Sequence, residues 1–160
     1  MAITDVASFG AIRERIYPLV AGLVAGATCF AGAPTFFCYA QSQNWKIGEI
    51  YVAGFEFSAV ATSFLFTFYT FVVTADRGFI ARMRNSIYFA DLITFTVRAL
   101  ILGTVLAIVS VPMMVMEPAP LTRWGFEAAE VTAWVFLAAW TLAAFVRTTR
   151  LFIAFAAADH

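Results

Sequence analysis

One carboxylate and a series of hydroxyls lie inside a long apolar stretch at positions 50–75. The stretch reads IYVAGFEFSAVATSFLFTFYTFVVTA and contains a single charged residue. At about 100° per residue, the carboxylate and four of these hydroxyls fall within roughly 60° of one another on a helix. We call them the polar stripe: Glu56, Ser63, Thr67, Thr70 and Thr74. Carboxylates and hydroxyls line ion-conducting pores, so this pattern indicates a site that could attract a cation or carry a proton.

The polar stripe also has structural interpretations. Serine, threonine and carboxylate side chains join neighbouring membrane helices through hydrogen bonds. Alternatively, Glu56 could extend toward the lipid headgroups, because it lies only about 9 Å from the start of the stretch. The residue pattern alone leaves these three interpretations open.

A second set of charges lies in the next apolar stretch. Asp91 and Arg98 are seven residues apart, so they lie within roughly 20° of each other around a helix. We predict an intramembrane ion pair between them. The pair could act as a gate, or it could simply lower the cost of placing Arg98 in the membrane.

A basic connector joins these two stretches and carries Arg77, Arg82 and Arg84. Arginines beside a span favour the cytoplasmic side of a membrane and contact anionic lipids there. The connector could also hold an anionic ligand or the acidic face of a partner.

The sequence contains little that could perform catalysis. Its only histidine is the last residue, His160, so this chain alone cannot supply histidine ligands within its helices for haem, zinc or copper. Motifs of nucleophilic hydrolases, zinc proteases and nucleotide-binding loops do not occur. We therefore expect no enzyme, no metal and no cofactor. Ten basic residues balance ten acidic ones, which gives no reason to expect nucleic acid binding.

Membrane-spanning helices must position these residues. Of the 160 residues, 62% are hydrophobic and 12% are charged, about half the charged fraction of a soluble domain. We predict an all-α integral membrane protein, a four-transmembrane-helix bundle with short loops in a single domain of residues 1–160. The predicted spans are 16–40, 50–75, 89–115 and 128–146, with surface helices at about 3–15 and 147–158.

Small residues in the first span predict close helix packing. Gly22 and Gly26 are four residues apart, so they share one helix face and allow another backbone to approach. We therefore expect this face of the first span to contact a second helix.

Basic residues predict the orientation of the spans. The termini and the connector carry most of them: Arg13, Arg15, Arg77, Arg82, Arg84, Arg147 and Arg150. The other two loops carry Lys46 and Arg123. This asymmetry predicts that both termini are cytoplasmic, and we expect a bacterial inner membrane as the location.

These features favour a homo-oligomeric ion channel or a pore-type membrane effector. Four helices enclose little room, so a path would require several copies. The alternative is a non-catalytic accessory or sensor subunit of a larger membrane complex. The expected partners are a bilayer with anionic lipids on its cytoplasmic side, and either further copies of the chain or other membrane subunits.

Overall fold

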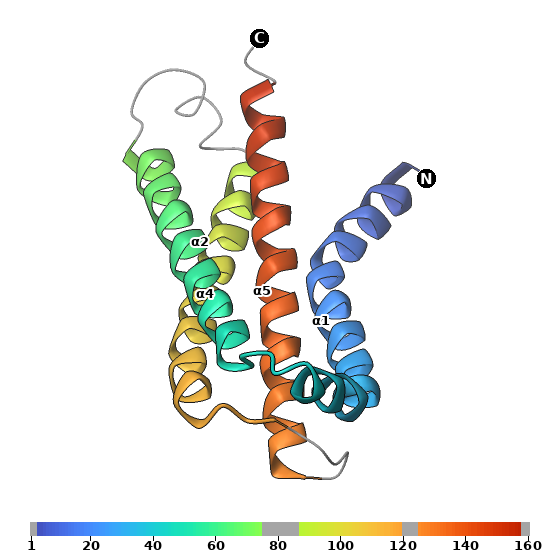
Figure 1. Cartoon of the computed structure of the whole chain (residues 1–160). Helices are drawn as coiled ribbons and strands as arrows, with labels where there is room; N and C mark the ends of the chain where they lie inside the picture. Colours follow the sequence, from blue (N-terminus) through green and yellow to red (C-terminus); the bar gives the residue numbers. More distant parts are fainter. Residues whose placement is uncertain (1–2, 75–86, 120–124, 158–160) are drawn as a thin grey trace. The chain divides into compact units, whose positions relative to one another are not determined.

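The computed structural model describes residues 3–74, 87–119 and 125–157 (Figure 1). Within these residues the chain forms helices and no strand: α1 (Ile3–Ser42), α2 (Gly48–Thr74), α4 (Ile87–Met116) and α5 (Phe126–Ala157). Each helix contains a segment long and apolar enough to cross a membrane: Ile16–Ser42, Gly48–Thr74, Phe89–Met116 and Phe126–Ala154. The prediction of an all-α chain with four such helices is confirmed, and these helices indicate a membrane-embedded protein.

Two predicted surface helices are continuous with the helices beside them. α1 continues through residues 3–15 without a break, where we predict a surface helix. α5 continues to Ala157 through Arg147 and Arg150, where we predict a surface helix at 147–158, and its segment apolar enough to cross a membrane is Phe126–Ala154. Arginine is a good helix former, so a change in polarity alone does not end a helix. Without these two arginines, the remaining basic residues still predict the same orientation.

The chain divides into two compact units. The first consists of residues 1–45 and 118–143, and the second consists of residues 46–117 and 144–160. The first part of α5 therefore belongs to one unit and its second part to the other. Each unit has its own packing pattern.

In the first unit, α1 packs closely against α5 through glycines. Gly22 and Gly26 are buried and both face Phe136. A Cβ atom on Gly22 would lie 3.0 Å from the backbone oxygen of Phe136 and 3.0 Å from the Cβ of Trp140. The two predicted packing residues thus lie where the two helix backbones approach each other.

The end of α1 is closed by a specific hydrogen-bond pattern. Asn44 adopts a left-handed conformation with φ 55°, which asparagine tolerates better than most residues. The Asn44 amide donates to the Gln41 carbonyl, and the Trp45 amide donates to the Ala40 carbonyl, both at 3.0 Å. These are the two bonds of a Schellman motif. The Trp45 ring then packs edge-on against Tyr39, with 5.8 Å between ring centroids.

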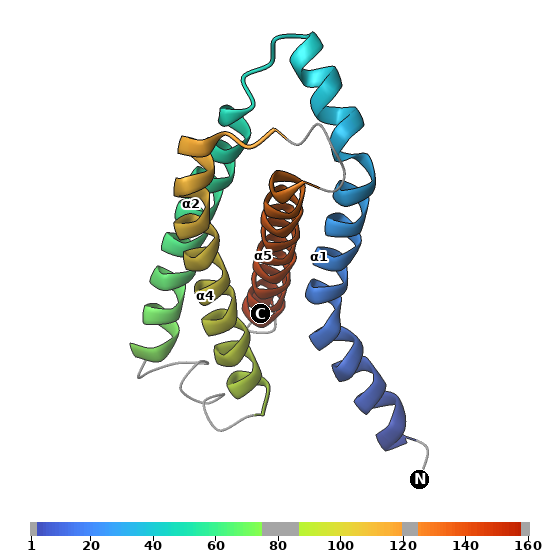
Figure 2. The same cartoon turned by 90° about the horizontal axis from the view of Figure 1, so that it is seen from below.

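In the second unit, α2 and α4 run side by side (Figures 1 and 2). Leu65 packs with Ala99, and Gly103 faces Thr62, so positions increase along α2 as they decrease along α4. The pair is antiparallel. The residues that α2 turns inward recur at three- and four-residue intervals: Tyr51, Gly54, Ser58, Ala61, Leu65, Phe68 and Val72. The matching set in α4 is Leu92, Thr96, Ala99, Gly103, Leu106, Ser110 and Met113.

This alternation of three and four residues is the repeat of a coiled-coil interface, and we call the contact the heptad seam. Its middle consists of small residues, which allow the two backbones to approach. Gly103 illustrates this, because a Cβ atom there would collide with the hydroxyl of Thr62. The heptad seam therefore fixes which face of α2 is buried and which face remains free.

The second part of α5 covers the heptad seam with aromatic rings. Phe145 packs edge-on against Phe57 and Phe64, with 6.1 Å between ring centroids in both pairs. About two helical turns further on, Phe152 packs against Phe68, with 4.4 Å between ring centroids. Edge-on aromatic pairs add roughly 0.5–1.5 kcal/mol beyond the area that they bury.

Gly22 and Gly32 offer a matched test of the α1–α5 contact. Gly22→Leu places a side chain against the backbone of α5, so we expect the free energy of unfolding to fall by about 1–3 kcal/mol. Gly32→Leu is the control, because Gly32 is exposed and a Cβ there meets no atom within 4 Å. Unfolding in detergent micelles, followed by circular dichroism, measures both variants. Equal losses in the two variants would contradict the packing role of Gly22.

Candidate functional site

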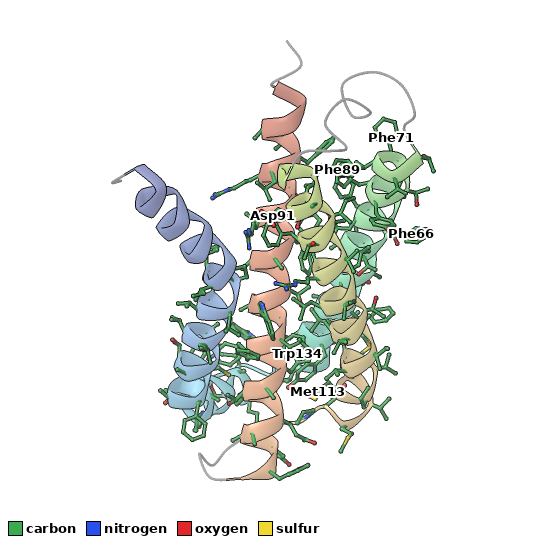
Figure 3. All side chains as sticks on the ribbon, turned by 180° about the vertical axis from the view of Figure 1, so that it is seen from behind. Phe66, Phe71, Phe89, Asp91, Met113 and Trp134 are labelled. Atoms are coloured by element: carbon green, nitrogen blue, oxygen red, sulfur yellow. The ribbon has the colours of Figure 1, made fainter. Side chains whose placement is uncertain are left out.

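The polar stripe lies on the free face of α2. All five of its residues are exposed, and on a helix they point away from the buried residues of the heptad seam. Two exposed rings flank it, Phe66 on one side and Phe71 on the other, with 61% and 60% of their surface accessible. Figure 3 shows both rings pointing outward from α2. The polar stripe is thus bordered by apolar side chains and is not covered within its own unit.

The hydroxyls of the polar stripe are bonded to their own helix. Ser63 donates to the carbonyl of Ala59 at 2.8 Å, and Thr67 donates to the carbonyl of Ser63 at 3.0 Å. Thr70 and Thr74 bond in the same way to the carbonyls four residues before them. Their protons are therefore occupied within α2. The hydroxyl oxygens keep lone pairs that can accept bonds from outside the helix.

Glu56 shares the same exposed face. It lies eight residues after Gly48, which places it about 12 Å along the axis of α2. In a bilayer this position falls within the hydrocarbon layer, where a carboxylate that faces lipid tails is costly. Glu56 is therefore favourable here only where it faces water or protein, or where its side chain reaches the headgroups.

A second polar set lies inside the heptad seam, and it was not predicted from the sequence. Ser58, Thr96 and Ser110 are fully buried. Each donates to a carbonyl of its own helix at 2.8 Å. These side chains are small enough for close packing, and their hydroxyl protons are already hydrogen-bonded to the backbone. The alternation of three and four residues between small side chains, for example at Ala99 and Gly103, is the signal that could have identified this set.

Charges gather where α4 meets the second part of α5. The Cζ atom of Arg147 lies 3.5 Å from the centroid of the Phe95 ring, which is a close cation–π contact. Asp91 precedes Phe95 by one helical turn and is half-buried, whereas Arg98 follows Phe95 by one turn and is exposed. Figure 3 shows Asp91 on α4, beside α5. The structure places Asp91 and Arg98 on one helix as predicted, and an ion pair between them stays a prediction.

The first residue of α2, Gly48, contacts the acidic side chain of Glu117. The carboxylate of Glu117 lies directly over Gly48, where a Cβ atom would collide with it. A negative charge at the start of a helix is favourable, because the backbone amides there carry partial positive charge. Lys46 and Glu49 form an exposed ion pair beside it at 3.2 Å. Glycine at position 48 thus makes room for the acid that follows α4.

The basic connector lies outside the described residues, so Arg77, Arg82 and Arg84 have no structural account here. Among the residues that the structure does describe, no group of three His, Cys, Asp or Glu side chains could hold a metal ion.

No protein-family model, no curated protein and no solved structure matches this chain. The four long apolar helices indicate a membrane-embedded helical protein. Its function has to be argued from the polar stripe and from the charges between α4 and α5.

Thr67 and Gly103 distinguish a functional stripe from a structural one. Thr67→Val removes an exposed hydroxyl that bonds only within α2, so we expect the free energy of unfolding to change by less than about 0.5 kcal/mol. Gly103→Leu forces α2 and α4 apart and should lower it by about 1–3 kcal/mol. Titration with a denaturing detergent measures both. If Thr67→Val is as destabilising as Gly103→Leu, the polar stripe holds the fold together.

Proposed function

We propose that the protein is a homo-oligomeric ion channel or pore-type membrane effector, and that the polar stripe lines its path. The observation that carries the proposal is the position of the polar stripe on the free face of α2, opposite the heptad seam. In a bilayer, lipid tails would meet Glu56 there at a high cost. Copies that turn this face toward a common axis would give it water instead.

The chemistry of the polar stripe favours cations. Glu56 supplies a negative charge, and the four hydroxyl oxygens offer lone pairs because their protons are bonded to the backbone of α2. Oxygen ligands of this kind replace part of the hydration shell of a cation. An anion would find no free proton donor among these hydroxyls.

The flanking rings suit contacts between copies. Phe66 and Phe71 lie about 70° to either side of the middle of the polar stripe. If the polar stripe faces an axis, these exposed rings face the neighbouring copies, where aromatic area is buried at little entropic cost. In the orientation that the basic residues predict, both termini are cytoplasmic and Glu56 lies toward the outer end of the path.

The alternative function is an accessory or sensor subunit of a larger membrane complex. The same free face of α2 would then contact a different protein. Purification in mild detergent distinguishes the two functions, because a channel yields an oligomer of this chain alone whereas a subunit yields a second protein in fixed proportion.

Conductance across planar bilayers tests the proposed path. The purified chain should carry a cation-selective current. Glu56→Gln should lower the cation-to-anion permeability ratio severalfold, because it removes the negative charge of the path. Thr67→Val should lower the conductance, because it removes an oxygen that accepts contacts from ions.

Two control variants sharpen this measurement. Thr104→Val removes an exposed hydroxyl of α4 that donates to Leu100 at 2.9 Å, and Glu127→Gln removes an exposed carboxylate at the start of α5. Neither belongs to the polar stripe, so currents should stay as in the unmodified chain. Absence of current, or equal effects of stripe and control variants, would refute the proposed path.

A further inference from the structure

Three arginines originate close to one aromatic ring in the second unit. Arg147 lies over Phe95, Arg98 follows Phe95 by three residues, and Arg150 follows Arg147 by three residues. Residues three apart on a helix are neighbours. All three side chains therefore originate within one helical turn of the contact between Phe95 and Arg147. We call Arg98, Arg147 and Arg150 the arginine cluster.

The arginine cluster carries more positive charge than the described residues of α4 and of the second part of α5 balance. Across positions 57–74, 87–116 and 144–157, Asp91 is the one acidic residue. Whatever ion pairs these four residues form among themselves, together they carry a net positive charge. A negatively charged ligand would neutralise this charge.

Position along the helices places the arginine cluster near one membrane surface. Arg98 lies 18 residues before Met116, which corresponds to about 27 Å along α4. Arg147 lies 21 residues after Phe126, which corresponds to about 31 Å along α5. The hydrocarbon layer is about 30 Å thick. If each helix crosses from its other end, both arginines reach the headgroup layer by extending their long side chains.

We propose that the arginine cluster binds the phosphate of an anionic membrane lipid. The planar guanidinium groups of Arg98 and Arg150 are exposed, and each can donate two parallel hydrogen bonds to phosphate oxygens. Stacking on Phe95 restricts Arg147, so it loses less freedom when a phosphate binds. The lipid lies in the leaflet where α2 ends and α4 begins, which is the cytoplasmic one in the predicted orientation.

Apolar side chains next to the arginine cluster favour a lipid over a soluble phosphate. Ile101, Val105 and Ile108 continue from Arg98 along the exposed side of α4 toward the middle of the span. They form an apolar track on which an acyl chain can lie while its phosphate stays at the arginines. Basic sites between helices at this depth are known recognition sites for lipid headgroups. The site does not depend on the proposed channel function.

Lipid retention by the full chain tests the site. The protein is transferred from vesicles that contain equal amounts of phosphatidylglycerol and phosphatidylcholine into mild detergent, and bound lipids are counted by native mass spectrometry. The unmodified chain should retain phosphatidylglycerol preferentially. Arg98→Gln should reduce this preference about fivefold and Arg98→Gln with Arg150→Gln should reduce it further, since each arginine near a membrane surface strengthens anionic lipid binding by about that factor.

Two further variants separate the site from general charge effects. Asp91→Asn removes the one negative charge beside the arginine cluster and should strengthen the preference. Lys46→Gln removes a positive charge at the other end of α2 and should leave it unchanged. Circular dichroism confirms that each variant keeps its helices.

Three outcomes would overturn the proposal. The first is equal retention of the two lipids by the unmodified chain. The second is an equal loss of preference in Lys46→Gln and Arg98→Gln. The third is displacement of bound phosphatidylglycerol by millimolar glycerol phosphate, which would assign the site to a soluble phosphate instead.

Discussion

The close contact between α2 and α4 determines how the second unit presents its polar groups. Apolar helices in a membrane gain little from burying more apolar surface, so close packing and satisfied hydrogen bonds must hold them together. The heptad seam provides both, through small residues such as Gly103 and through buried hydroxyls that bond to their own helix. Because the buried face of α2 is fixed in this way, Glu56 and its hydroxyls are left on the free face. The candidate path is thus a consequence of the packing on the opposite side of the same helix.

The second part of α5 packs against both α2 and α4 and brings basic residues to their pair. Its phenylalanines pack over α2, whereas Arg147 reaches across to Phe95 of α4. Aromatic packing and cation–π contact therefore lie on different sides of one helix. The unit combines an acidic, hydroxyl-rich face on α2 with a basic region between α4 and α5. These two regions have opposite charge, which is why we propose different ligands for them, a cation for the first and a lipid phosphate for the second.

The sequence predicts the helices better than it predicts their contacts. Length and apolar composition identified the four helices that are long and apolar enough to cross a bilayer. The spacing of Gly22 and Gly26 identified a packing face, but it could not name Phe136 as the partner. The segments predicted as surface helices, 3–15 and 147–158, continue α1 and α5 without a break as far as the structure describes them, because a change in polarity without a cap does not end a helix. The contact of Arg147 with Phe95 joins residues 52 positions apart, and no local pattern encodes such a pair.

The glycine contact of α1 has a consequence for the order of events during synthesis. α2 can pair with α4 soon after both have left the ribosome, since they are neighbours in the chain. Gly22 contacts Phe136, which is made more than a hundred residues later. At about 5–20 residues per second, the interval is on the order of ten seconds. α1 therefore waits for α5, and its small-residue face stays open to lipid, to chaperones or to wrong partners throughout that time.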